Sequence, residues 1–142
     1  MYAPVAVVVD LLAMYELTIK TDFSAAHNLR GYEGKCERLH GHNWHIEVYV
    51  EARELNDLEM AVDFKLLKAE TNKIMEKFDH RYLNEVAPFD KINTTAENIA
   101  RIIFKGLAAV IDDGNLRVSK VRAWESHKAA AAYYEPPAVG QS

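Results

Sequence analysis

Two stretches of the chain alternate apolar and polar residues with a period of two, which is the pattern of a β-strand with one buried face. The first runs from Tyr15 to His27, and its apolar face ends on that histidine. The second runs from His42 to Ala52. One of its faces carries Trp44, Ile46, Val48 and Val50, and the other carries Asn43, His45, Glu47 and Glu51. Strand parity therefore places His45 on the face away from His42.

Two helices are predicted after these strands, because apolar residues recur there at helical spacing. The first begins near Asp63 and ends near Phe78. The second begins with a capping box at residues 94–97, in which the Thr94 hydroxyl and the Glu97 carboxylate each satisfy a free backbone amide. The expected buried stripes are Phe64, Leu67, Ile74, Met75 and Phe78 in the first helix, and Ile99, Ile102, Ile103, Leu107 and Val110 in the second.

Two shorter strands follow the helices, at about Leu116–Glu125 and Ala129–Tyr134. The order strand, strand, helix, helix, strand, strand predicts an α+β fold: an antiparallel sheet with both helices on one face. A sheet of four strands has two free edges, which favours the association of several copies into a barrel.

The two ends of the chain differ from the part between them. Residues 1–13 are apolar but lack the basic start of a signal peptide. We expect them to form a flexible extension, or to precede the true start at Met14; an extra strand on a neighbouring subunit is the alternative. Residues 14–135 are expected to form one domain, and residues 136–142 a frayed tail.

Composition narrows the classes of protein that fit. The 142 residues are 49% hydrophobic and 27% charged, which allows a packed core and excludes global disorder. The net charge of -4 includes no basic stripe, which argues against nucleic acid as the main partner. The apolar run Val5–Val9 is far shorter than the ~20 residues that span a membrane. A single cysteine excludes an internal disulfide framework, fits a reducing compartment and indicates a cytoplasmic protein.

The strongest chemical signal is the histidine pair of the segment Cys36–His42, CERLHGH. His40 and His42 are two residues apart at the start of a strand, so both imidazoles project to one face, with Cα atoms roughly 6.5–7 Å apart. His27 ends the preceding strand on its inward face and offers a third imidazole. Three histidines with an open fourth position are typical of a catalytic zinc site, whereas ordinary core or surface histidines are the alternative.

Three further groups are candidates for chemistry. Cys36 is either a fourth metal ligand or a thiolate base. Asp79 and His80 form a pair in which a carboxylate orients a proton-shuttling imidazole, although a histidine that merely decorates a helix end is the alternative. Glu125 shares a face with apolar strand residues, where a carboxylate suits a flat heterocycle with adjacent N–H donors, or is a plain strand-end glutamate.

With these motifs in view, the chain resembles the family of 6-pyruvoyltetrahydropterin and 6-carboxytetrahydropterin synthases over about Tyr15–Tyr134. The resemblance rests on FSAAH ending at His27, CERLHGH at residues 36–42, VDF at 62–64, DHRYLN at 79–84, NTTAEN at 93–98 and WES around Glu125. It implies a tunnelling fold (T-fold), ββααββ, that trimerises into a barrel and pairs into a hexamer.

The resemblance also implies roles for residues. Zinc is expected on His27, His40 and His42. The catalytic base and the proton relay match Cys36, Asp79 and His80, and the pterin anchor matches Glu125. Thr95, in the NTTAEN motif, is expected to be a further substrate contact.

In members with the spacing C-x3-HGH, the resemblance implies a lyase that converts 7,8-dihydroneopterin triphosphate to 6-carboxy-5,6,7,8-tetrahydropterin, acetaldehyde and triphosphate, a step toward queuosine. The alternative within the family is a 6-pyruvoyltetrahydropterin synthase. Glu37 suggests an additional cleavage of dihydroneopterin to a hydroxymethyl pterin, unless it is only a loop carboxylate. A non-catalytic zinc- or pterin-binding module is the alternative of another class.

Overall fold

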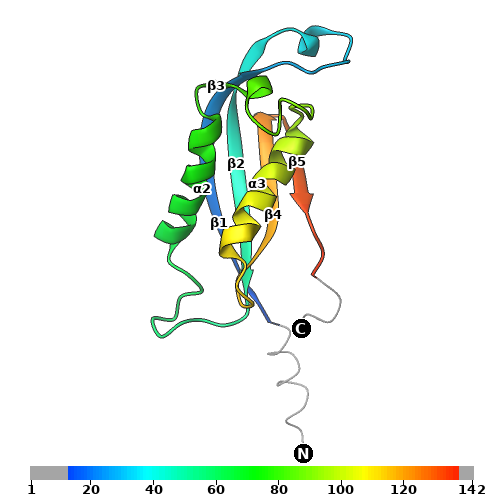
Figure 1. Ribbon diagram of the computed structural model, residues 1–142. Coiled ribbons are helices and arrows are strands. Elements are labelled where there is room, and N and C mark those ends of the chain that lie inside the picture. The colour runs from blue at the N-terminus through cyan, green and yellow to red at the C-terminus, as the bar shows by residue number, and fades with distance from the viewer. Residues whose placement is uncertain (1–12, 138–142) are drawn as a thin grey trace, which may run out of the picture.

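The computed structural model describes residues 13–137, apart from the side chain of Cys36, and shows one sheet with two α-helices packed on one face (Figure 1). The extension predicted for residues 1–13 and the tail predicted for 136–142 lie almost entirely outside the described residues. The strands are β1 (Tyr15–His27), β2 (His40–Ala52), β3 (Arg81–Tyr82), β4 (Arg117–Ser126) and β5 (Ala129–Tyr134). The helices are α2 (Phe64–Phe78) and α3 (Ala96–Ile111), with short 3-10 turns η1 (Lys35–Glu37) and η2 (Leu83–Glu85).

The predicted α+β class is confirmed, with one strand more than expected. The sheet order is β3-β1-β2-β4-β5, and all neighbours are antiparallel except β3, which runs parallel to β1. β3 has only two residues, pairing Arg81 with Ala25 and Tyr82 with Ala26. A strand this short shows no periodic pattern, so the sequence could not indicate it.

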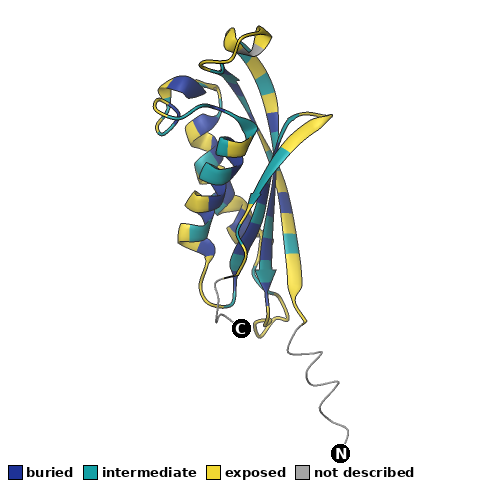
Figure 2. Ribbon diagram, turned by 90° about the vertical axis from the view of Figure 1, so that its right-hand side faces the viewer, coloured by how far each residue is buried: buried dark blue, intermediate teal, exposed yellow. Residues whose placement is uncertain are grey.

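The hydrophobic core lies between the sheet and the helices, where buried residues of both layers meet (Figure 2). Phe23 of β1 and Trp44 of β2 stack with ring centroids 6.1 Å apart, and both are almost fully buried. Leu67 of α2 and Ile103 of α3 are fully buried from the helical side. Each such side chain contributes roughly 1.5–3 kcal/mol relative to leaving it exposed. Two residues predicted on the buried helical stripes, Phe64 and Val110, are instead 50% and 60% exposed.

The start of α3 differs from the predicted capping box by one residue. The N-cap is Thr95, whose hydroxyl accepts a hydrogen bond from the Asn98 amide at 3.2 Å. Thr94 is fully buried, and its hydroxyl lies 3.1 Å from Nδ1 of His27. The predicted cap is therefore wrong, because the Thr94 side chain turns toward β1 and the next threonine replaces it as the cap.

The other face of the sheet, called here the open face, has no helix on it among residues 13–137 (Figure 2). The sheet edges are also largely free within this range: β5 pairs with β4 alone, and β3 covers only two residues of β1. Among the described helices, none is long and apolar enough to cross a membrane.

Candidate functional site

The pairing of β1 with β2 brings the three predicted metal-binding histidines together. His27 lies directly opposite His40, and His42 lies opposite Ala25. The ring centroids are 4.5 Å apart for His27 and His40, 5.1 Å for His27 and His42, and 4.7 Å for His40 and His42. Together with Glu125 of β4, they offer four ligand atoms that all lie within 4.8 Å of one another. We call these four residues the histidine cluster.

The hydrogen bonds of His27 and His40 leave the Nε2 atoms of these two rings available to a metal ion. Nδ1 of His27 lies 2.9 Å from the Thr94 carbonyl oxygen, and Nδ1 of His40 lies 2.7 Å from the Arg38 carbonyl oxygen. A ring that donates its Nδ1–H to a carbonyl carries its lone pair on Nε2, which is how backbone groups commonly orient metal-binding histidines. Among the side chains that the structure describes, none forms a hydrogen bond with the buried Nε2 atoms of His27 and His42. A buried acceptor without a partner is costly, so this donor set fits a metal ion.

Burial favours the neutral form of His27 and His42, which is the form that binds metal. Desolvation lowers the pKa of His27, and it outweighs the hydrogen bond to Thr94 and the Glu125 charge, which act in the opposite direction. Desolvation likewise lowers the pKa of His42, against the pull of Glu125. Trp44 packs edge-on against two of the rings, with its ring centroid 5.2 Å from that of His27 and 5.4 Å from that of His42.

Glu125 connects the cluster to a cavity. Its Oε1 lies 3.1 Å from Nε2 of His42 and 3.7 Å from Nε2 of His27, and its side chain is 34% exposed. Glu125, His27 and Thr95 line one cavity of about 210 Å³ between the start of α3 and β5. The structure therefore brings the predicted heterocycle anchor, the weaker predicted contact Thr95 and a predicted metal ligand to the same cavity.

The Asp79–His80 pair directly follows α2 and lies beside β1, where Asp79 contacts the backbone of Ser24. Asp79 Oδ1 accepts a hydrogen bond from the Ser24 amide at 2.9 Å, and Oδ2 lies 3.0 Å from Nδ1 of His80. The Ser24 amide is the main cause of a lowered pKa of Asp79, to which His80 adds. The His80 ring is 82% exposed and shares a groove of about 490 Å³ with His42. The pair thus borders the cluster without belonging to it.

The model of the 6-pyruvoyl tetrahydropterin synthase family matches residues 16–136 of this chain. The chain belongs to this family. Two relatives named 6-carboxy-5,6,7,8-tetrahydropterin synthase, from Synechocystis and Haemophilus influenzae, are 36% and 31% identical to it. The matches cover 80% and 86% of this chain and 88% and 100% of the relatives.

A solved structure agrees with the family assignment. The 6-pyruvoyl tetrahydropterin synthase of Caenorhabditis elegans matches with a TM-score of 0.78 and 27% identity, over 87% of this chain and 97% of that one. The predictions of this family, of its T-fold and of an enzyme of the pterin synthase kind are confirmed.

The family motif CERLHGH begins on a long connection between β1 and β2 that extends beyond the helices (Figure 1). Cys36 and Glu37 lie there, in η1. Glu37 is exposed, and its carbonyl oxygen accepts a hydrogen bond from the Asn28 side chain at 3.2 Å. The position of the Cys36 thiol lies outside the described part of the structure, so its predicted role stays a prediction.

Two asparagines of the family motifs have a role that the sequence did not reveal. Asn84 accepts a hydrogen bond from the Asn28 amide at 3.1 Å and donates one to the Asn28 carbonyl at 2.9 Å. Asn93 makes the same pair of bonds with the backbone of Arg30, at 2.9 and 3.0 Å. These bonds hold the segment that follows His27 against the connection between α2 and α3. In the sequence, only their places within the motifs DHRYLN and NTTAEN indicated that these two asparagines matter.

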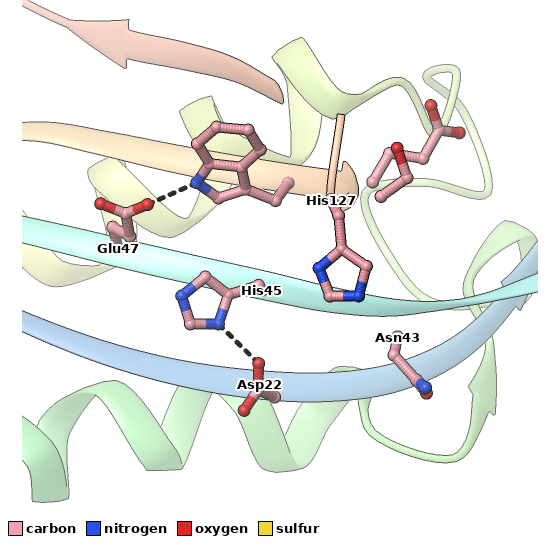
Figure 3. Close-up of a pocket in the computed structure, with 8 residues that line it drawn as sticks. Asp22, Asn43, His45, Glu47 and His127 are labelled. Atoms are coloured by element: carbon pink, nitrogen blue, oxygen red, sulfur yellow. Dashed lines mark hydrogen bonds and ion pairs between the residues drawn. The ribbon is translucent and has the colours of Figure 1, made fainter. Parts of the chain in front are cut away.

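A second cavity, of about 580 Å³, lies on the open face of the sheet (Figure 3). Nδ1 of His45 lies 2.7 Å from Oδ1 of Asp22 there, which confirms that His45 points away from the face that carries the histidine cluster. Glu125 also lines this cavity, together with Glu47 and His127. Glu125, at the end of β4, therefore borders both cavities.

Proposed function

We propose that this protein binds zinc through His27, His40 and His42 and converts 7,8-dihydroneopterin triphosphate to 6-carboxy-5,6,7,8-tetrahydropterin, acetaldehyde and triphosphate. The observation that carries the proposal is the pair of buried Nε2 atoms without hydrogen-bond partners, placed beside a cavity that Glu125 lines. The names of the relatives and the spacing C-x3-HGH favour the carboxy-forming reaction over the pyruvoyl-forming one.

The cavity residues suit a pterin. The Glu125 carboxylate can accept two parallel N–H bonds from the aminopyrimidine edge of the ring, and bonds of this bidentate kind are strong. Thr95, at the N-terminus of α3, borders the same space and offers a hydroxyl. A bound zinc ion would act as a Lewis acid on the hydroxyls of the substrate side chain.

In this proposal, Cys36, Asp79 and His80 transfer the protons. Cys36, as a thiolate, removes a proton from the side-chain carbon next to a hydroxyl. His80, oriented by Asp79, returns a proton at a later step. The pterin ring is reduced while the bond between the first two side-chain carbons breaks: the carbon attached to the ring takes an oxygen from water and becomes a carboxylate, and the other two carbons leave as acetaldehyde. Electrons move within the substrate, so water is the only co-reactant and no external oxidant or reductant is needed.

We further propose that the active form is a trimer or hexamer in which sheets join edge to edge. The free edges of β1 and β5 support this, since unpaired strand edges favour pairing with another chain. The His80 ring is exposed enough to serve a cluster on a neighbouring chain. Sedimentation of the active enzyme tests the assembly, and an active monomer would contradict it.

The function is tested by product analysis of the zinc-loaded protein with 7,8-dihydroneopterin triphosphate. We expect acetaldehyde and 6-carboxytetrahydropterin in equal amounts. Release of triphosphate without acetaldehyde would indicate the pyruvoyl-forming reaction instead. Plain 7,8-dihydroneopterin, assayed in parallel, tests the additional cleavage suggested by Glu37. Binding without turnover of either substrate would identify a non-catalytic binding module.

A further inference from the structure

A carboxylate on the open face, that of Glu47, is held by two donors. It is only 9% exposed, and it accepts hydrogen bonds from the Trp124 indole N–H and, at 2.6 Å, from the Tyr49 hydroxyl. Figure 3 shows the bond between Glu47 and the indole spanning from β2 to β4. A carboxylate this buried is expected to have partners, and here the partners come from its own strand and from the neighbouring one.

Trp124 is the last residue of β4 that pairs with β2, opposite His45. On its other side, β4 pairs with β5 through Trp124 and Ala130, and next through Ser126 and Ala129. Two steps along β4 therefore match one step along β5, which leaves Glu125 as the extra residue of a β-bulge. Bulges next to functional sites redirect a side chain, and this one carries the residue that reaches the histidine cluster.

Trp124 and Glu125 are consecutive residues whose side chains contact opposite faces of the sheet, so the two are coupled through one short piece of backbone. The indole lies on the open face, where Glu47 holds it, and the Glu125 carboxylate lies on the other face, within 3.1 Å of Nε2 of His42. β2 no longer pairs with β4 beyond Trp124. The indole bond therefore acts on the same residue as the last backbone pair between β2 and β4, directly before the bulge.

We propose that Glu47 is a positioning residue: by holding Trp124 on the open face, it fixes the bulge that aims Glu125 at the substrate cavity. The inference rests on the proposed role of Glu125 as the pterin anchor. Glu47 itself does not line the cavity that Glu125 shares with His27 and Thr95. Its effect is therefore on substrate binding more than on the chemical step.

The test compares Glu47→Leu, Trp124→Phe and the double variant, all loaded with zinc. Each single change removes the hydrogen bond, and we expect KM for 7,8-dihydroneopterin triphosphate to rise about tenfold with kcat within about threefold. The double variant should be no worse than either single one, because both changes remove the same interaction. Additive losses, or a loss confined to kcat, would overturn the proposal.

Two controls separate positioning from general damage. Glu47→Gln keeps an oxygen that accepts the indole bond, so KM should stay within about twofold of the parent. Glu51→Gln changes a carboxylate on the same strand and face that pairs with Arg117 instead, and should leave KM unchanged. If Glu47→Gln behaves like Glu47→Leu, the charge rather than the bond to Trp124 matters, and the proposal fails.

A structural measurement keeps this inference distinct from the proposed function. In crystals of Trp124→Phe, which retains a ring at that position, the Glu125 carboxylate should move away from His42. If Glu125 stays in place, the positioning role is wrong even if the enzyme turns over the pterin triphosphate. If Glu125 moves but the parent protein has no such activity, the positioning role stands and only the proposed function fails.

Discussion

His27 and His40 face each other across the β1–β2 ladder, with ring centroids 4.5 Å apart, although 12 residues separate them in the chain. Their meeting depends on the register of the two strands, which pair from Tyr15 with Ala52 to His27 with His40. A slip by one residue would turn one strand's histidines to the open face. The buried apolar residues along the rest of the ladder prevent such a slip, so the packing of the core maintains the geometry of the candidate metal site.

Removing one histidine of the cluster should empty the metal site, whereas removing a histidine from the other face should not. We expect His42→Ala to lower bound zinc sharply, because it deletes one of the buried Nε2 donors. His45→Ala is the matched control, since that ring bonds to Asp22 on the open face. Metal analysis of both proteins after dialysis is the measurement. Equal loss from both would mean that zinc binds elsewhere.

Cys36→Ala separates a base from a ligand. If Cys36 removes a proton, the variant should retain the zinc content of the parent and lose turnover by at least about a hundredfold, as is typical for loss of a general base. Zinc content and product formation are measured on the same sample. Loss of zinc together with activity would make Cys36 a fourth ligand, and an unchanged rate would assign the base to another group.

Trp44 should be among the most costly residues to truncate. It is fully buried, stacks on Phe23 and contacts the rings of two histidines of the cluster. We expect Trp44→Ala to lower the free energy of unfolding by about 3–5 kcal/mol, measured by urea denaturation of the metal-free protein. Val110→Ala, at an exposed position of α3, should cost less than about 0.5 kcal/mol. Similar losses for the two variants would contradict the described core.

Glu47 should make stability depend on pH in the acid range. Burial acts to raise its pKa, but the hydrogen bonds from Tyr49 and Trp124 outweigh it, so the pKa lies below the ordinary value of 4.5. The folded state then binds this proton less tightly than the unfolded state, and its contribution is present above about pH 4.5 and lost below it. The stability difference between the metal-free parent and Glu47→Gln should therefore shrink from pH 7 to pH 3.5 in urea titrations. A constant difference would contradict this assignment.

Local patterns predicted much of the site. Strand parity is a property of the backbone, so the period-two pattern was enough to place His27, His40 and His42 on one face and His45 on the other. Glu125 was placed with the apolar residues of its strand for the same reason. The motifs then identified the family and its T-fold.

The rest depended on contacts between distant parts of the chain. Thr94 was expected to cap α3, but its side chain lies against His27, 67 residues away. Asn84 and Asn93 brace the backbone after β1 through bonds of similar sequence separation. The bulge at Glu125 arises from a mismatch between two strands. None of these features leaves a periodic pattern in the sequence, because each depends on contacts with residues that only folding brings close.

The chain has two tryptophans, and each lies beside a different part of the candidate site. Trp44 contacts the rings of His27 and His42, while Trp124 immediately precedes Glu125 and bonds to Glu47. The unmodified protein thus carries an optical reporter for each half of the site. In the parent protein, the emission of Trp44 responds to occupancy at the histidines. In Trp44→Phe, which leaves Trp124 and its bond to Glu47 in place, the emission follows the end of β4 alone, so a stopped-flow comparison of the two proteins times metal loading and pterin entry separately without an added label.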